Sequence, residues 1–137
     1  AAADPALDVR TNAEGEVDAV VMLSDVLFGF DDASLEPTAL DVLSEVAAKL
    51  DGVARIEITG HTDSLGETGY NLALGERRAG AVRDWLIANT GLTAEMITAR
   101  GVGEADPIAA NTNEDGSDNP EGRALNRRVE FTLPGEG

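Results

Sequence analysis

The sequence predicts an α/β domain in which helices cover a single sheet. Two segments with apolar residues at helical spacing, one between Pro37 and Gly52 and one at 71–89, alternate with apolar segments typical of strands. The strand-like segments lie at residues 17–30, 55–59, 97–102 and 129–133. Strands that are separated by helices imply crossover connections, which place the helices on the sheet.

The chain is long enough and apolar enough to fold as one domain. It has 137 residues, of which 42% are hydrophobic, and a chain of this length can bury a single core. Aromatic residues are limited to one Trp, one Tyr and three Phe, so the predicted core consists mainly of Ala, Val, Leu and Ile. We assign the domain to residues 17–134, with residues 135–137 as a C-terminal tail.

The first half of the chain supplies a tether, strands and one helix. Residues 1–16 are rich in Ala, Asp and Glu without sustained periodicity, so they are predicted to be a poorly ordered tether. The apolar runs within residues 17–30 predict one or two buried strands. The next helix is predicted from Pro37, which suits a first helical turn, to the stop signal at Gly52. The alternation at residues 55–59 predicts a further strand.

The second half supplies the longer helix and the last strands. The helix at 71–89 is followed by a short turn at 93–96 and then by the strand at 97–102. Residues 103–122 are predicted to form a long polar loop or a short helix. The final strand opens at Asn126 and shows apolar residues in alternation with polar ones up to Leu133.

Charge and composition argue against several classes of function. The net charge of -16 argues against nucleic acid, whose binding depends on Lys and Arg, and against adsorption to anionic lipid. A single His and the absence of Cys argue against zinc and exclude disulfides. No apolar run approaches 18 residues, so direct membrane insertion by this fragment is not expected. The chain begins at Ala1 without Met and is expected to be a mature or excised fragment.

The stretch from Ile58 to Leu86 carries the main functional signal. A strand runs into the turn Gly60–Asp63, a Gly-containing loop follows, and the next helix carries Arg78. A strand, loop and helix that return along the sheet could bring Asp63 and Arg78 side by side. A fixed carboxylate beside a fixed guanidinium suits a zwitterion such as the head of an amino acid. The alternative is an internal salt bridge that orients the loop on the helix.

Motifs in this stretch and on both sides of it resemble one known family. The matching residues are Leu27–Asp31, Gly60–Asp63, Gly66, Tyr70–Asn71, Leu74, Arg78–Ala79, Gly101–Gly103, Pro107, Asn111, Glu121–Arg123 and Asn126–Val129. In this order they are similar to the signature of the OmpA-like domain, the peptidoglycan-binding domain of outer membrane protein A, of the peptidoglycan-associated lipoprotein and of the stator protein MotB. The resemblance implies a β-α-β-α-β-(α)-β fold, a two-layer sandwich with helices packed on a mixed sheet.

The resemblance implies a function as well as a fold. OmpA-like domains bind peptidoglycan through diaminopimelate of the stem peptide, whose free end bears an ammonium and a carboxylate. By this resemblance Arg78 grips the carboxylate and Asp63 accepts a hydrogen bond from the ammonium. The domain would then anchor an outer-membrane or envelope protein to the cell wall from the periplasm, with envelope proteins as further candidate partners. The alternative is an OmpA-like protein-interaction or adhesin module that does not bind peptidoglycan.

Three residues near this pair are further candidates for the binding site. Leu74 lies one helical turn before Arg78 and could pack on the aliphatic stem of the ligand, or simply in the core. Asn71 could cap the helix or bind a stem-peptide amide, and capping is favoured. Thr62 offers a backbone N–H and a hydroxyl beside Asp63.

Three more candidates depend on the resemblance. Phe30 and Asp31, at the end of the first predicted strand, match positions that line the pocket in the family, although Asp31 could equally cap a turn. The family pattern also places an arginine from the start of the last strand near the pocket, where it faces acidic groups. We assign that role to Arg127.

The turn after the strand also contains the residue types of a catalytic triad. His61, Asp63 and Ser64 lie within four positions of one turn, and residues so crowded rarely reach the geometry in which a third group orients the base against the nucleophile. The Gly-x-Ser-x-Gly motif of a nucleophile elbow is absent. We therefore predict binding without catalysis, and we expect His61 to hydrogen-bond the backbone and hold the loop.

The acidic loop at residues 111–119 resembles the start of a calcium-binding loop. Asn111, Asn113, Asp115 and Ser117 place oxygen ligands at alternate positions, with a glycine sixth. The first position is Asn where Asp is usual, and the twelfth is Gly where Glu is usual. The favoured interpretation is a flexible acidic loop, with calcium binding as the alternative, and no other cofactor is predicted.

Overall fold

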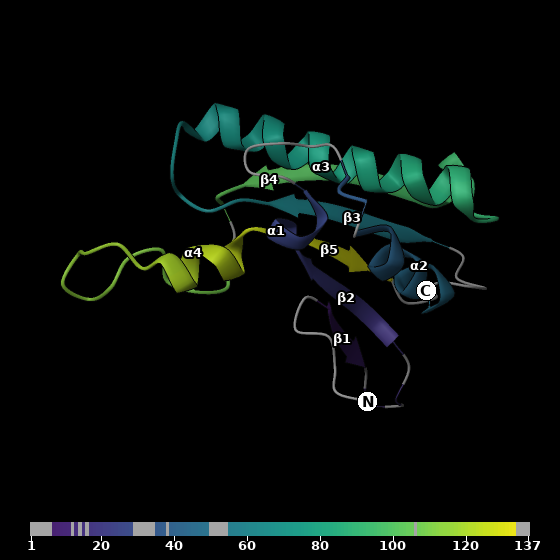
Figure 1. The fold of residues 1–137 in the computed structure, drawn as a ribbon, viewed down its shortest axis with the longest axis horizontal. Helices are drawn as coiled ribbons and strands as arrows, with labels where there is room; N and C mark the ends of the chain where they lie inside the picture. Colours follow the sequence, from purple (N-terminus) through teal and green to yellow (C-terminus); the bar gives the residue numbers. More distant parts are fainter. Residues whose placement is uncertain are drawn as a thin grey trace.

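The structure, a computed structural model, contains a five-stranded sheet with helices packed against it (Figure 1). It describes residues 7–11, 13, 15, 17–28, 35–37, 39–49, 55–105 and 107–133. The strands are β1 (Leu7–Thr11), β2 (Val17–Leu23), β3 (Ile56–His61), β4 (Ile97–Gly103) and β5 (Arg128–Thr132). The helices are α1 (Ser24–Leu27), α2 (Ala39–Lys49), α3 (Thr68–Asn89), the 3-10 helix η1 (Ala94–Met96) and α4 (Pro120–Asn126).

The sheet is mixed, with the strand order β1-β2-β5-β3-β4. Strands β3 and β4 are parallel and are joined through α3, because parallel neighbours need a crossover connection. The other neighbouring pairs are antiparallel, and the last strand, β5, lies at the centre between β2 and β3. The mixed α+β architecture with helices on a sheet, as expected from the sequence, is confirmed.

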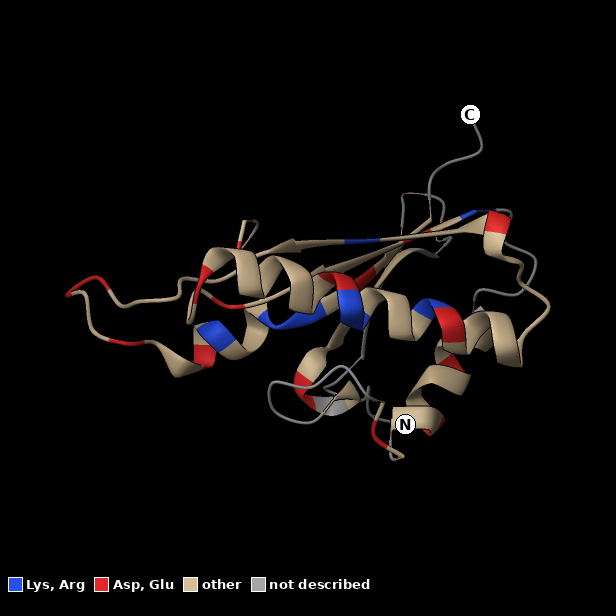
Figure 2. Ribbon diagram, turned by 90° about the horizontal axis from the view of Figure 1, so that it is seen from above, with Lys and Arg blue, Asp and Glu red and all other residues tan. Residues whose placement is uncertain are grey.

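One hydrophobic core lies between the strands and the helices α2 and α3. Phe131 of β5 and Ile58 of β3 are cross-strand neighbours, and both are fully buried. Leu43 of α2 and Val82 of α3 are fully buried in the same core. Burying a side chain of this size stabilises a fold by about 1.5–3 kcal/mol. The core therefore holds both helices against the strands. Figure 2 shows from above how the long helix α3 runs alongside the strands.

Two glycines let α3 approach the sheet closely. A Cβ atom on Gly60 of β3 would overlap the carbonyl oxygen of Gly75 in α3, and a Cβ atom on Gly75 would lie 2.6 Å from the carbonyl oxygen of Gly60. Both contacts are with backbone, so a larger residue at either position would push the helix away. This contact sets the distance of α3 from β3 one turn before Arg78.

Residues Leu7–Thr11, which the sequence placed in a poorly ordered tether, form β1, so that part of the prediction is wrong. The strand pairs antiparallel with β2, from Leu7 opposite Met22 to Thr11 opposite Val17. A five-residue strand is too short to show a clear alternation, and it is held by backbone hydrogen bonds to the edge of β2. The sheet therefore extends to the N-terminal side of the predicted domain start.

The segment after β2 also differs from the prediction. Residues 26–28 were expected to continue as a strand, but the chain turns at Ser24 into the single helical turn α1. The backbone N–H of Ser24 donates to the carbonyl oxygen of Arg127 (2.8 Å), and that of Phe28 donates to Ser24 (2.8 Å). Leu27 and Phe28 remain buried, so their apolar character reflects core packing in a turn.

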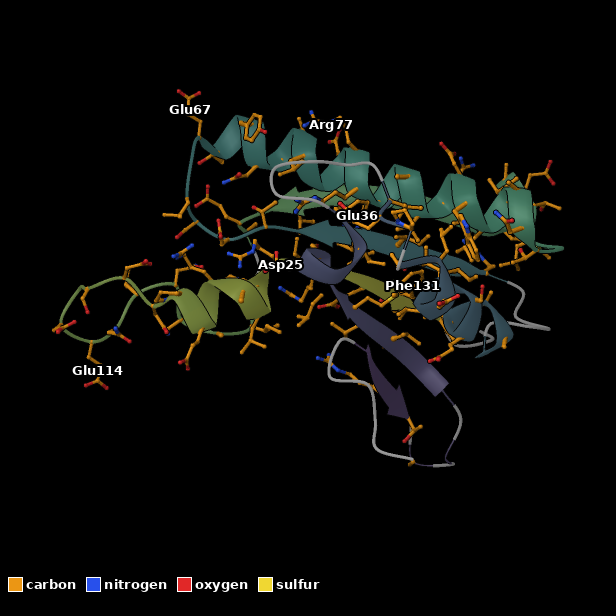
Figure 3. All side chains as sticks on the ribbon, in the orientation of Figure 1. Asp25, Glu36, Glu67, Arg77, Glu114 and Phe131 are labelled. Atoms are coloured by element: carbon orange, nitrogen blue, oxygen red, sulfur yellow. The ribbon has the colours of Figure 1, made fainter. Side chains whose placement is uncertain are left out.

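The long helix α3 starts three residues earlier than predicted, at Thr68, after the extended residue Glu67. Its inner face buries Leu74, Val82 and Leu86, while Arg77 points away from the sheet (Figure 3). No helix among the described residues combines the length and apolar character that crossing a bilayer requires.

The region predicted as a long loop or short helix ends in α4. The side chain of Asn119 caps this helix by accepting a hydrogen bond from the backbone N–H of Gly122 (3.3 Å), and Pro120 occupies the first turn. The final strand was predicted to open at Asn126. That prediction is wrong, because Asn126 is the last residue of α4. Arg127 lies in the turn between α4 and β5.

Candidate functional site

A pocket of about 280 Å³ lies where β3 runs into α3. Its walls come from the loop after β3, the first turns of α3, the turn α1, and α4 with the residue that follows it. The lining residues are Asp25, Thr62, Asp63, Leu65, Gly66, Tyr70, Asn71, Leu74, Arg78, Arg123 and Arg127. The members predicted from the sequence are Thr62, Asp63, Asn71, Leu74, Arg78 and Arg127.

Asp63 provides a buried carboxylate, with 11% of its side chain exposed. Its Oδ2 accepts a hydrogen bond from Nη1 of Arg127 at 2.6 Å and lies 3.5 Å from Nη1 of Arg123. Its Oδ1 accepts from the backbone N–H of Leu65 at 3.0 Å, which closes the loop after β3. The carboxylate is therefore fixed by two arginines on one oxygen and by its own loop on the other.

Arg78 reaches the pocket from the buried face of α3. Its guanidinium carbon lies 5.2 Å from the centre of the Phe28 ring, a cation–π contact, and the residue is only 4% exposed. Leu74, one turn earlier, is also buried and lines the same wall. Asp63 and Arg78 thus line one pocket, while the salt bridges of Asp63 shown by the described residues are with Arg127 and Arg123.

Asn71 and Thr62 hold the loop that carries Asp63. Nδ2 of Asn71 donates to the carbonyl oxygens of Asp63 (3.3 Å) and Leu65 (2.8 Å). The predicted capping role of Asn71 is wrong, because the helix begins at Thr68 and Asn71 belongs to its first turn. The hydroxyl of Thr62 donates to the carbonyl oxygen of Asp63 (2.9 Å), and its backbone N–H donates to that of Gly103 (2.9 Å).

Arg127 and Arg123 each hold a second aspartate as well as facing Asp63. Arg127 donates to both carboxylate oxygens of Asp25, from Nε at 2.9 Å and from Nη2 at 2.8 Å. Arg123 donates to both oxygens of Asp118, from Nε at 2.6 Å and from Nη2 at 2.7 Å. The hydrogen bond to Asp25 raises the pKa of Arg127, and that to Asp118 raises the pKa of Arg123.

Asp25 and Arg123 are pocket residues that the sequence did not reveal as site residues. Arg123 lies in a motif that matches the family, so the sequence did carry a signal at this position. The direction of its side chain, however, could not be predicted from the sequence alone. Asp25 follows an apolar strand with no distinctive pattern, and its partner Arg127 lies 102 residues further along the chain. Three arginines and two aspartates line the pocket, and a third aspartate, Asp118, pairs with Arg123 next to it. The charges at the pocket are therefore close to balanced, in a chain of net charge -16.

Three further residues were named from the sequence. Of these, Phe30 and Asp31 fall outside the described residues. His61 ends β3 and is buried, with Nε2 3.7 Å from Oε2 of Glu130 on the neighbouring strand. The side chain of His61 thus faces the neighbouring strand β5, and His61 does not line the pocket.

The loop at 111–119 is shaped by hydrogen bonds among the four calcium candidates and their neighbours. Oδ1 of Asp115 accepts from the backbone N–H and the hydroxyl of Ser117, and Nδ2 of Asn113 donates to the hydroxyl of Ser117. Oδ1 of Asn111 accepts from Nδ2 of Asn126. Within the described residues no group of three or more His, Cys, Asp or Glu is arranged to hold a metal ion. Calcium binding stays a prediction, and a calorimetric titration without heat at millimolar calcium would contradict it.

Comparison with known proteins identifies relatives over most of the chain. A family model described as the OmpA family matches residues 27–120. Outer membrane protein A of Yersinia pseudotuberculosis is 39% identical over 123 residues, which cover 82% of this chain and 33% of that protein. The peptidoglycan-binding protein ArfA of Mycobacterium bovis is 42% identical over 110 residues, which cover 79% and 32% respectively.

A further relative carries a different name. A Gloeobacter violaceus protein named as a photosystem I chlorophyll a apoprotein is 43% identical over 119 residues, which cover 85% of this chain but only 14% of that protein. The chain thus spans a third or less of the length of each of these three curated relatives. The name of a whole relative therefore describes far more than the matching segment.

Two solved structures share the fold. The cell wall anchor of the T6SS from Pseudomonas aeruginosa has a TM-score of 0.76 at 33% identity, with 93% of this chain and 87% of that chain covered. A putative MotB-like protein from Desulfovibrio vulgaris has a TM-score of 0.77 at 30% identity, with 96% and 80% covered. Family model, relatives and fold agree, and the chain belongs to the OmpA family.

Proposed function

We propose that this domain binds peptidoglycan non-covalently by holding the free end of a diaminopimelate residue of the stem peptide. The guanidinium of Arg78 would grip the ligand carboxylate, and the carboxylate of Asp63 would accept a hydrogen bond from the ligand ammonium. The observation that carries this proposal is that one buried carboxylate and one buried guanidinium line the same pocket. Such a pair is complementary to a zwitterion.

The rest of the pocket suits one amino-acid end better than a larger group. A volume of about 280 Å³ is at the small end for ligand sites. Leu74 offers an apolar wall for the aliphatic stem of the ligand. Both amide hydrogens of Asn71 are used by loop carbonyls, so its Oδ1 is the atom left to accept from a stem-peptide amide. Thr62 and Arg127 would act mainly by fixing Asp63.

Binding without catalysis agrees with the chemistry of the pocket. Its cationic groups are arginines, which stay protonated and cannot transfer protons at ordinary pH. The carboxylate of Asp63 is held by arginines and by the loop, an arrangement that suits recognition of charge. The OmpA family, outer membrane protein A and ArfA are named for structure or binding and not for a reaction.

The names of two similar proteins support a role at the cell wall. ArfA is named a peptidoglycan-binding protein, and the Pseudomonas structure is named a cell wall anchor. We infer that the domain anchors an outer-membrane or envelope protein to the wall and acts in the periplasm. Which component it anchors would depend on sequence outside the matching segment, since that segment is a third or less of each of the three curated relatives.

Co-sedimentation with purified sacculi tests this proposal. The unaltered protein, Asp63→Ala and the charge-matched control Asp84→Ala are compared, with free diaminopimelate as competitor. Asp84 lies on α3 with 80% of its side chain exposed and outside the pocket. We expect the unaltered protein and Asp84→Ala to sediment, Asp63→Ala to stay soluble, and the free amino acid to displace both binders.

Two other outcomes would change the interpretation. Soluble protein in every lane would contradict peptidoglycan binding and favour a protein-interaction or adhesin module with the same fold. Release of soluble muropeptides from the sacculi would show a wall hydrolase, and we expect none.

A further inference from the structure

Asp25 and Asp118, which lie far apart in the sequence, each hold one arginine in the same way: Asp25 holds Arg127, and Asp118 holds Arg123. Each aspartate accepts two hydrogen bonds from the Nε and Nη2 edge of one arginine, at 2.6–2.9 Å. This parallel arrangement fixes the plane of a guanidinium, whereas a single contact would leave it free to rotate. We call Arg123 and Arg127 the paired arginines. Their remaining nitrogen, Nη1, faces Asp63 in both cases.

The paired arginines converge on one oxygen of Asp63. Nη1 of Arg127 and Nη1 of Arg123 lie 2.6 Å and 3.5 Å from Oδ2. Within the described part of the chain, Oδ1 accepts one hydrogen bond, from the backbone N–H of Leu65. A carboxylate oxygen can accept two, so Oδ1 retains capacity for a ligand donor.

The exposure of the two aspartates argues against a role in stability alone. The side chains of Asp25 and Asp118 are 53% and 55% exposed, and exposed ion pairs contribute about 0–1 kcal/mol to folding. Asp63, in contrast, is only 11% exposed. The orientation of its carboxylate therefore depends on the side chains that contact it, Arg123 and Arg127. Figure 3 shows Asp25 at α1.

We propose that Asp25 and Asp118 are positioning residues that fix the paired arginines on Oδ2 of Asp63 and thereby reserve Oδ1 for the ammonium of the ligand. This inference rests on the proposed function and adds the residues that set the geometry of its site. Asp118 belongs to the loop at 111–119, so the loop contributes to the pocket through Arg123 without lining it.

Isosteric variants of the full chain test the proposal. Asp25→Asn and Asp118→Asn remove one charge each and keep the side-chain shape, and Asp84→Asn is the matched control at an exposed site. Binding of a purified diaminopimelate-containing muropeptide is measured by calorimetry. We expect roughly tenfold weaker binding for Asp25→Asn and a smaller loss for Asp118→Asn, because Arg123 is further from Asp63 than Arg127 is. Asp25→Glu, which keeps the carboxylate, should recover part of the loss.

A second readout needs no ligand. The Nε–H protons of the paired arginines should exchange slowly with water in the unaltered protein, as measured by NMR. Asp25→Asn should release the proton of Arg127 and leave that of Arg123 protected, and Asp118→Asn should do the reverse. A general loss of stability would instead release both protons together in each variant and would lower the thermal midpoint.

The outcomes separate this inference from the proposed function. Failure of the unaltered protein to bind the muropeptide overturns the proposed function, and with it the assignment of Oδ1 to an ammonium. Binding by the unaltered protein, with Asp25→Asn and Asp118→Asn equal to Asp84→Asn, overturns the positioning role alone. Unchanged Nε–H exchange in both variants also overturns it, because the aspartates would then not fix the arginines.

Discussion

The pocket and the loop at 111–119 are both rich in polar and acidic residues, but they are built differently. In the pocket, Asp63 is buried and bonded to Arg123 and Arg127, which lie 60 and 64 residues away in the sequence. In the loop, Asp115 is exposed and bonded to Ser117, two residues away. Figure 3 shows Glu114 at the tip of this loop, well away from the body of the domain that holds Asp25.

The difference shows how a pocket of converging side chains differs from a polar turn. Short-range hydrogen bonds between exposed groups define the loop's own conformation and lower the pKa of Asp115 through its bond with Ser117. Long-range contacts between the buried Asp63 and part-buried arginines define the pocket, and they leave specific atoms directed at a cavity. Electrostatic interactions are also much stronger at partly buried positions than in water.

The largest expected effect is on the pocket. Arg78→Ala should weaken binding of a muropeptide by roughly 2–5 kcal/mol, because the ligand carboxylate would lose its buried partner. Calorimetry measures the affinity, and Arg100→Ala is the control, since Arg100 is an exposed arginine on β4. Equal affinities of these two variants would contradict the site.

The glycines of the two regions should differ in their effect on stability. Gly60→Ala should destabilise the fold by about 1–3 kcal/mol, because its Cβ would overlap the backbone of Gly75. Gly116→Ala should cost about 1 kcal/mol through its positive φ of 86° alone, since nothing lies within 4 Å of the added Cβ. Urea unfolding of both variants measures the difference, and a larger loss for Gly116→Ala would reverse the comparison.

Added salt should not weaken binding at the pocket. The chain and peptidoglycan are both anionic, so long-range repulsion opposes binding, while the pocket acts at short range. Raising sodium chloride from about 0.05 M to about 0.3 M should leave affinity unchanged or increase it, as calorimetry with the muropeptide would measure. A steep fall of affinity with salt would mean that long-range attraction, and not the pocket, drives association.

The smallest effect concerns Asp118, which joins the loop to the pocket. Its hydrogen bonds with Arg123 lower its pKa below the ordinary value of 3.8. A carboxyl whose pKa is depressed on folding contributes stability above its unfolded pKa and loses it as pH falls through the folded value. The Arg123–Asp118 pair should therefore persist at pH 4 and open below pH 3.8. NMR titration of the Asp118 carboxyl carbon measures this pKa in the unaltered protein and in the Arg123→Ala variant. A midpoint at or above 3.8 in the unaltered protein would contradict the prediction.

Sequence reasoning located much of the pocket but not its salt bridges. Asp63, Leu74 and Arg78 were found because a strand, a glycine-containing turn and a helix have recognisable local patterns, and the structure places all three in one pocket. Arg127 was placed near the pocket, facing acidic groups, through the family resemblance, and the structure shows it in the pocket. Its pairing with Asp63, and the contribution of Arg123, were not found, because pairing between distant residues leaves no local pattern. The role of Asp63, Leu74 and Arg78 as ligand-binding residues remains a prediction.

Contacts between distant segments also explain why two elements of the fold were predicted wrongly. Strand β1 is held by pairing with β2, so residues 7–11 looked like an unstructured arm when considered alone. Residues 26–28 looked like a strand because they are apolar, yet Leu27 and Phe28 are buried from a turn.

Periodicity, composition and short motifs were enough to establish the order of the main strands and helices, the acidic character and the family resemblance, because each of these is a local property of the chain. The folded arrangement was needed to show that Asp63 pairs with Arg127 and Arg123, and that among the described residues Oδ1 of Asp63 accepts one hydrogen bond, from Leu65. It was also needed to show that Asp25 and Asp118 hold those arginines. Those features depend on distances between segments that are far apart in the sequence and that folding brings together.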